Sequence, residues 1–515
     1  MWKCPVCDKE DNAATVCPTC GYDRTCDYER YPTAFTVKGA KSTRALRREW
    51  QAKQNPPTNP QPQPAAPPTA QPAPTAAPAK KESGLWKALA VVAVIAFVIA
   101  AVKFAVGSYP SVMYYGGYSG AYVNIRLNSG SISNQMVEDA QKLLKAYSCT
   151  RIQISEGAVD AASMEQISKL ADVEEIVFSG YTKVSDFDRL SGMPNLSCIH
   201  LTGSSESESE LDLTGIESIA TLESLYISGF ESVDLTELRN AVQLKSLGVN
   251  YSDNITNLNG LAGLTNLTQL DLISDRISDL QPLSDLTNLT ELDLGNNQIS
   301  DLQPISNLTN LTVLGIRNNQ ITSLAGLENL TKLTSIDAYG NNITTLAGLE
   351  NLTKLTSIDA YGNNITTLAG LENLTNLTEL SLYGNQISDL QSISKLSNLT
   401  YLSLESNRIT SLTGLENLTN LTFLVLDNNQ ISDLQPISGL TNLKRLNING
   451  NQITSLAGLE NLTKLTDLEI GSNQITTLAG LENLTNLTYI YASGNPLTDT
   501  SALEVSGCMD ALTTD

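Results

Sequence analysis

Four cysteines near the start of the chain have the spacing of a metal site. Cys4 and Cys7 form one Cys-x-x-Cys motif, and Cys17 and Cys20 form a second. Four thiolates at this spacing close a tetrahedron around Zn²⁺, and a segment this short cannot be held together by apolar burial alone. We therefore expect a structural zinc ribbon over residues 1–30, with no open position for a substrate. A redox dithiol or a disulfide pair is the alternative.

The rest of the chain offers little catalytic chemistry. His200 is the single histidine among 515 residues, and no nucleophile arrangement, phosphate-binding glycine loop or His/Glu metal cluster accompanies it. We therefore expect no enzyme activity and interpret His200 as a core or surface residue. Cys149, Cys198 and Cys508 have no compelling pairing, so we expect buried thiols.

Repetition is the dominant feature of the chain. The repeated segments predict the structural elements on which any functional site must lie. AGLENLTKLTSIDAYGNNITTL, residues 325–346, is repeated letter for letter at residues 347–368. The same 22-residue pattern, LxxLxxLxLxxNxIxxLxxL, also fits the segments that begin at Leu286, Leu396 and Leu484, whereas coils early in the array are irregular in length. This period and leucine spacing are typical of a leucine-rich repeat solenoid. Two identical segments supply only like groups, whereas a catalytic centre needs unlike groups that converge.

The positions within each repeat have predictable structural roles. In Leu292-Asp293-Leu294 the leucines point into the coil and Asp293 points outward, as in a short strand. Stacked coils then bury an apolar layer that one coil cannot bury alone. An asparagine lies at the same place in ten successive turns, and we expect its carboxamide to satisfy backbone groups of its own turn and of the next coil. These residues are Asn297, Asn319, Asn341, Asn363, Asn385, Asn407, Asn429, Asn451, Asn473 and Asn495.

The repeat LTNLTELDLGNNQISDLQPISNL resembles the 22-residue repeats of the bacterial internalins. The resemblance covers about Val173 to Leu503. It implies a curved right-handed solenoid with a parallel sheet on the concave face and 3-10 or irregular segments on the convex side. It also implies that the concave face binds protein partners. The chain lacks an ordinary signal peptide and an LPxTG-type sorting signal, so we expect another means of attachment.

A membrane anchor is expected before the repeats. Residues 1–106 carry 14 Lys and Arg against 8 Asp and Glu, whereas the remaining residues carry 18 against 46. Between the two parts, residues 85–106 would span about 33 Å as a helix, long enough for a bilayer. The preceding positive charges, in a basic and Pro/Ala-rich linker at residues 31–84, place the amino terminus in the cytoplasm and the repeats outside. A buried core helix and a cleaved signal peptide are the alternatives.

The segments that flank the repeats complete the predicted order. Residues 107–120 read as a Gly/Tyr stalk, and residues 121–172 as an N-terminal cap with a first irregular coil. Within the cap, residues 133–148 place Met136, Val137, Ala140, Leu143, Leu144 and Tyr147 on one helical face, and residues 151–155 form a strand. This helix is expected to cover the open end of the first coil. Residues 504–515 read as a tail.

The candidate partner site lies on the predicted concave face. Adjacent strands are about 4.8 Å apart, so aromatic side chains on consecutive coils are expected to form one stripe edged with carboxylates. Exposed tyrosines beside acids are a plausible hot spot for an extracellular protein or glycan. Duplication alone, which copies tyrosines without a function, is the alternative. The stripe consists of Asp337, Tyr339, Asp359, Tyr361, Tyr383, Tyr401 and Phe423.

Three functions are consistent with this organisation. The first is a membrane-anchored recognition or adhesion protein whose repeats bind a protein or glycan. The second is a transmembrane sensor or scaffold, in which a cytoplasmic protein binds the zinc ribbon. The third is a structural envelope protein. Nucleic-acid binding by the repeats is not expected, because residues 107–515 carry a net charge of −28.

Overall fold

The computed structural model describes most of residues 112–514 and two short strands near the start of the chain. The gaps are residues 116–120, 128–130, 156–158, 182, 204–209, 231, 253–254 and 256. The chain divides into two units, Met1–Phe97 and Val98–Asp515. In the first unit, β1 (Trp2–Lys3) pairs antiparallel with β2 (Glu10–Asp11). Cys4, Cys7, Cys17, Cys20, the linker and residues 85–106 lie outside the described residues.

The second unit begins with a cap. Strand β3 (Val112–Tyr115) pairs antiparallel with β4 (Tyr122–Arg126), and β4 pairs parallel with β5 (Arg151–Ser155). Helix α3 (Asn134–Tyr147) packs beside them. The expected helix and strand are therefore confirmed. The cap begins earlier than predicted, however, because residues 112–115 of the expected stalk form β3. Within the described residues, no helix has the length and apolarity needed to cross a bilayer.

The apolar face of α3 covers the first strands. Val137, Ala140 and Leu144 are buried, and Ser133 caps the helix by accepting a hydrogen bond from the backbone N–H of Met136. Tyr147 remains 53% exposed, although its ring stacks on that of Tyr114 with centroids 3.8 Å apart. The predicted face is thus buried at its centre and exposed at its end.

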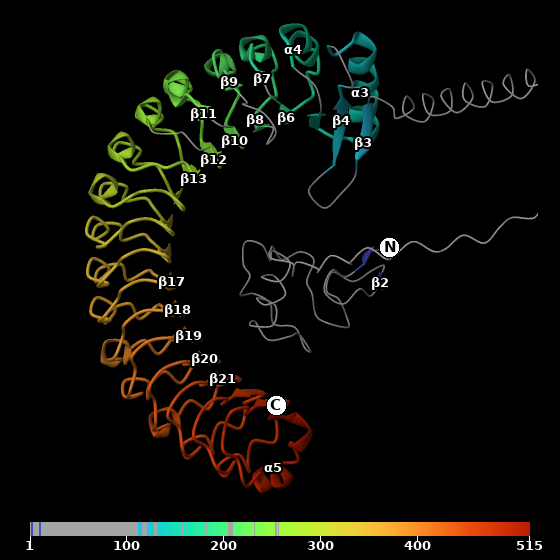
Figure 1. The fold of residues 1–515 in the computed structure, drawn as a ribbon. Helices are drawn as coiled ribbons and strands as arrows, with labels where there is room; N and C mark the ends of the chain where they lie inside the picture. The colour runs from blue at the N-terminus through green and yellow to red at the C-terminus, as the bar shows by residue number, and fades with distance from the viewer. Residues whose placement is uncertain are drawn as a thin grey trace, which may run out of the picture. The chain divides into compact units, whose positions relative to one another are not determined.

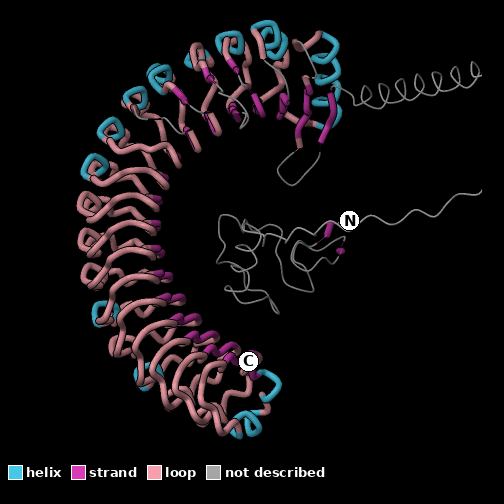
Figure 2. Tube along the Cα trace, in the orientation of Figure 1, coloured by secondary structure: helices cyan, strands magenta, loops and turns pink. Residues whose placement is uncertain are grey.

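One series of strand pairs continues through the repeats to the end of the chain. Each strand pairs parallel with the next, and the strands lie along the inner side of an arc of coils (Figures 1 and 2). The series consists of β6 (Glu175–Tyr181), β8 (Cys198–Gly203), β10 (Ser224–Ser228), β12 (Ser246–Asn250), β13 (Gln269–Ile273), β14 (Glu291–Asp293), β15 (Val313–Gly315), β16 (Ser335–Asp337), β17 (Ser357–Asp359), β18 (Glu379–Ser381), β19 (Tyr401–Ser403), β20 (Phe423–Val425), β21 (Arg445–Asn447), β22 (Asp467–Glu469) and β23 (Tyr489–Tyr491).

The outer side of the arc carries short helical turns and irregular loops, as the resemblance to internalin repeats implies (Figure 2). Helix α4 (Ala161–Ile167) is followed by short 3-10 turns in many coils, such as η7 (Gln303–Ile305) and η9 (Gln435–Ile437). A small parallel sheet joins β7 (Lys183–Val184), β9 (Glu210–Leu211) and β11 (Ser232–Val233) in the early coils.

The asparagines form a buried ladder inside the coils. In Asn363, the Nδ2 group donates to the carbonyl oxygens of Ala338 and Ala360, each at 3.1 Å, and Oδ1 accepts from the N–H of Ile343 at 3.0 Å. The prediction that one carboxamide donates and accepts is confirmed. Its partners outside its own turn lie in the preceding coil, however, and not in the next one.

The carboxyl end of the array is also closed. Helix α5 (Ser501–Ser506) buries Leu503, and η10 (Met509–Ala511) leads into β24 (Leu512–Thr513), which pairs parallel with β23. Residues 504–514, which were predicted to belong to a tail, are therefore part of a terminal cap. Cys149 and Cys508 are buried and Cys198 is half-buried, and all three are free thiols.

Candidate binding surface on the concave face

Three columns of side chains face outward on the concave side of the sheet. The middle residue of each short strand is buried, as Leu292, Ile358 and Leu380 are. The residue before it belongs to the first column and the residue after it to the second, and both are at least partly exposed in most coils. The third column lies two residues beyond the strand. Because adjacent strands pair in register, Asp337 lies beside Asp359 and Tyr401 beside Phe423. The concave position predicted for these residues is therefore correct.

Three tyrosines of the third column stack on one another; we call Tyr339, Tyr361 and Tyr383 the tyrosine stack. The ring centroids of Tyr339 and Tyr361 are 4.4 Å apart with an interplanar angle of 6°, and those of Tyr361 and Tyr383 are 5.3 Å apart at 28°. Burial raises the pKa of Tyr339 and Tyr361, so both phenols stay neutral. Stacking covers the ring faces that lie between neighbouring tyrosines and leaves the ring edges outside these contacts.

A second aromatic group lies in the first column. Tyr401 and Phe423 stack with centroids 5.2 Å apart, and the guanidinium of Arg445 lies 5.2 Å from the centroid of Phe423. Tyr383 and Tyr401 stand at opposite ends of their strand segments, about 13 Å apart along the strand direction. The expected single stripe is thus two separate groups of rings.

Carboxylates accompany the tyrosine stack, and one arginine lies between two of them. The Nη1 atom of Arg317 is 2.8 Å from Oδ2 of Asp293 and 3.5 Å from Oδ2 of Asp337. Burial raises the pKa of Asp337 to about 6, against the opposing effect of Arg317, and burial also raises the pKa of Asp359. The buried Oδ1 of Asp337 has no hydrogen-bond partner. The negative charge of this carboxylate is therefore only partly compensated by its neighbours.

Asp427 is a further acidic residue that the sequence analysis did not select. It is 8% exposed, and its Oδ1 accepts a hydrogen bond of 2.6 Å from the N–H of Asn449. Burial, together with the nearby carboxylates of Glu469 and Glu405, raises its pKa to about 7. Its place in the same column as the tyrosine stack, two coils beyond Tyr383, is the signal in the sequence that would have identified it.

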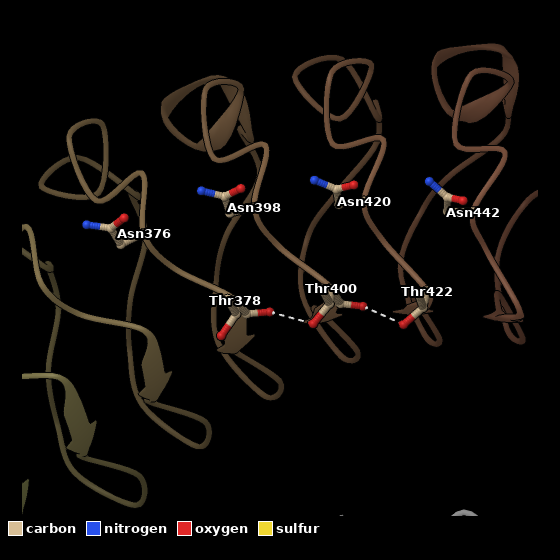
Figure 3. Close-up of a pocket in the computed structure, with 7 residues that line it drawn as sticks. All are labelled: Asn376, Thr378, Asn398, Thr400, Asn420, Thr422 and Asn442. Atoms are coloured by element: carbon tan, nitrogen blue, oxygen red, sulfur yellow. Dashed lines mark hydrogen bonds between the residues drawn. The ribbon is translucent and has the colours of Figure 1, made fainter.

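A shallow groove on another side of the coils is built from the repeat's own ladders (Figure 3). It is lined by Asn376, Thr378, Asn398, Thr400, Asn420, Thr422 and Asn442. Each asparagine donates to a backbone carbonyl of the preceding coil, as Asn398 does to Thr375 at 2.8 Å. Each threonine hydroxyl does the same, as Thr400 does to Thr378 at 3.1 Å. The side chains of these Asn-Leu-Thr triplets therefore serve the stacking of the coils.

One polar cluster joins residues that the sequence analysis had not associated. Glu175 on β6 and Cys198 and His200 on β8 place one carboxylate oxygen, one thiol and one ring nitrogen within 4.8 Å of one another. His200 is therefore not an isolated side chain, because a carboxylate and a thiol from two neighbouring strands lie beside it. The residues come from two coils whose register the irregular early repeats do not reveal in sequence.

Comparison with known proteins agrees with the fold. Residues 265–505 match the family described as leucine rich repeats (2 copies), in overlapping segments. No curated protein matches the sequence. This part of the chain is a leucine-rich repeat solenoid.

Solved structures extend the likeness beyond the matched repeats. The internalin InlF from Listeria monocytogenes is 27% identical, with 74% of this chain and 94% of that chain covered and a TM-score of 0.53. A leucine-rich repeat protein from Leptospira interrogans is 24% identical, with coverages of 68% and 91% and a TM-score of 0.60. The plant peptide hormone receptor RGFR1, in complex with RGF2, is 18% identical, with coverages of 79% and 71% and a TM-score of 0.54. The chain is thus structurally similar to internalins.

Proposed function

We propose that the concave face binds an extracellular protein partner that carries basic side chains, and that residues 85–106 anchor the chain in the membrane. The observation that carries this proposal is the tyrosine stack with the carboxylates of Asp337 and Asp359 beside it. Leucine-rich repeat proteins, including plant receptor ectodomains, bind protein ligands, and this chain shares their fold.

A basic protein fits this surface better than a glycan does. Sugar rings bind to open aromatic faces, whereas the faces of Tyr361 are occupied on both sides by Tyr339 and Tyr383. The hydroxyl edges of the stack can instead accept hydrogen bonds from a partner. A lysine or arginine near Asp337 would favour its ionised form and offset the cost of burying that charge.

The test compares partner capture by three forms of the chain. We expect Tyr361→Ser with Tyr383→Ser to leave the far-ultraviolet circular dichroism unchanged and to weaken binding by tenfold or more, about 1.4 kcal/mol. Tyr489→Ser with Tyr491→Ser is the matched control, because these tyrosines flank Ile490 on the same face, outside the stack. A partner cross-linked to intact cells carrying the wild type should be lost with the first variant only.

Two results would count against this proposal. A partner retained equally by both tyrosine variants would remove the stack from the binding surface. A partner that glycosidase treatment releases would favour the glycan alternative over a protein.

The membrane topology has a separate test. Protease treatment of intact cells should remove the repeats and spare residues 1–84. Protected repeats with a cleaved amino terminus would reverse the proposed orientation. The zinc ribbon formed by Cys4, Cys7, Cys17 and Cys20 also stays a proposal, with a possible cytoplasmic protein partner.

A further inference from the structure

Glu175, Cys198 and His200 form a compact set of unlike ligands at the amino-terminal end of the concave face. The Nε2 atom of His200 is 3.3 Å from Sγ of Cys198 and 3.1 Å from Oε1 of Glu175. The side chains of His200 and Glu175 are 33% and 26% exposed, and Cys198 is half-buried. The cluster is thus accessible from solvent while its backbone is fixed in the sheet.

We propose that these three side chains bind one divalent transition-metal ion of the zinc class. Zn²⁺ takes thiolate, imidazole and carboxylate ligands at about 2.0–2.3 Å, so that ligand atoms in a tetrahedral site lie about 3.4–3.6 Å apart. The two distances that His200 makes are already close to this spacing. The oxygen of Glu175 and the thiol of Cys198 lie within 4.8 Å of each other, so small side-chain rotations bring all three ligand atoms onto one ion.

Neighbouring residues hold the ligands in place. The ring of Tyr226, on the next strand, stacks on His200 with centroids 4.7 Å apart, and its hydroxyl group is 2.9 Å from Oγ of Ser246. The register of β6 and β8 places Glu175 directly beside Cys198. An imidazole fixed by stacking and a carboxylate fixed by strand pairing lose little conformational entropy when a metal binds.

Arg151 and the types of ligand together determine which class of metal the site prefers. Its Nε lies 3.0 Å from Oε1 of Glu175, and its guanidinium is 6.0 Å from the centroid of the Tyr122 ring. This positive charge opposes every divalent cation, and it also competes for the carboxylate oxygens that are the main ligands of Ca²⁺ and Mg²⁺. Thiolate and imidazole ligands favour the zinc class instead. Three protein ligands leave a fourth position open to water or to a group from a partner.

Binding of the ion must displace a proton from the thiol. Burial, together with the carboxylate of Glu175, raises the pKa of Cys198 to about 12, so the free protein holds a neutral thiol. Coordination breaks the S–H bond, forms the sulfur–metal bond and releases one proton to solvent. No oxidation occurs. His200 binds through Nε2 as the neutral tautomer: the proton that Nε2 directs at Oε1 of Glu175 in the free protein leaves to solvent and Nδ1 takes one up, so the imidazole adds no net proton to the balance.

The experiment uses Co²⁺ as the probe and the full chain with Cys4, Cys7, Cys17, Cys20 and Cys26 replaced by serine, so that the amino-terminal cysteines contribute no signal. A thiolate-to-cobalt charge-transfer band in the near ultraviolet reports coordination by Cys198 directly. We expect one Co²⁺ per chain, displacement of the ion by Zn²⁺, and release of one proton per ion bound. Cys508→Ser is the matched control, because it removes another thiol at the opposite end of the array.

Single substitutions then test each ligand. Cys198→Ser should abolish the charge-transfer band, while His200→Gln and Glu175→Gln should each weaken Co²⁺ binding at unchanged circular dichroism. A band that is missing from the starting protein, or that survives Cys198→Ser, overturns the site. Unchanged affinity in Glu175→Gln or His200→Gln overturns the three-ligand assignment.

Discussion

Asp427 is a carboxylate buried among other carboxylates, and this arrangement ties stability to pH. Its pKa of about 7 in the folded protein lies above the value of about 3.9 in an unfolded chain. Between these values the folded state holds a proton that the unfolded state has released. The free energy of unfolding therefore falls as the pH rises from about 4 to about 7.

Asp427→Asn should remove this pH dependence. Asparagine cannot ionise, yet its side-chain oxygen can still accept from the N–H of Asn449. We expect the variant to be more stable than the wild type by about 1–2 kcal/mol at about pH 8, with the difference vanishing near pH 4. Urea unfolding at both pH values measures it, with exposed Asp510→Asn as the control. Equal differences at both pH values would contradict the assignment.

For individual residues, the position on the concave face could be predicted from the sequence, whereas their grouping and burial could not. The concave position of Asp337 and Tyr361 could be predicted, because a period of two along a strand fixes the outward residues. The division of the aromatic residues into two groups could not be seen as easily, because Tyr383 and Tyr401 lie in different columns of adjacent coils. The burial of a carboxylate and the compensation of its charge depend on which side chains of the adjacent coils lie beside it. These neighbours become visible only with the register of the coils.

At the scale of the single coil, glycine governs the convex turn. Coils that contain Ala-Gly-Leu-Glu place this glycine in the left-handed region, and Gly370 has a φ of +106°. Its N–H donates to Oε2 of Glu372 at 2.8 Å. A Cβ atom at this position would lie 2.6 Å from the backbone oxygen of Leu346. Because that oxygen belongs to the preceding coil, it cannot move without disturbing the stacking.

Gly370→Ala should therefore destabilise the array by about 2–4 kcal/mol, through backbone strain together with the close contact. Gly439→Ala is the matched control, because its nearest contact would be the backbone oxygen of Glu416 at 3.8 Å and its φ is not in the left-handed region. We expect the control to change stability by less than about 0.5 kcal/mol. Comparable losses in the two variants, measured by urea unfolding, would show that helical or turn propensity and not the close contact is responsible.

The coils themselves could be predicted well, and the ends less so. The frame of leucines and asparagines fixes strand, turn and buried ladder because each position has one physical role in every copy. Residues 112–115 and 504–515 lack this frame, so their strands and the terminal helix were not predicted. The cluster of Glu175, Cys198 and His200 was missed for the same reason, since the early coils are irregular in length.

At the scale of the whole solenoid, the doubled segment allows one coil to be removed in register. Deletion of residues 347–368 joins Leu346 to Ala369, which opens the same Ala-Gly-Leu-Glu sequence as Ala347. Strand β16 would then pair with β18 as it now pairs with β17. Each coil contacts only its neighbours, so every remaining interface has a counterpart in the present structure.

We expect this deletion to leave a folded solenoid that is shorter by about 4.8 Å and slightly less stable, because one coil and one stacking interface are lost. The tyrosine stack would lose its central ring, so partner binding should weaken more than stability does. Deletion of residues 134–147 is the contrasting change, because it removes Val137, Ala140 and Leu144 from the end of the core. Circular dichroism and size-exclusion chromatography should show a folded monodisperse protein in the first case and aggregation in the second. A coil deletion that aggregates as readily as the cap deletion would show that the array is stabilised by contacts beyond nearest neighbours.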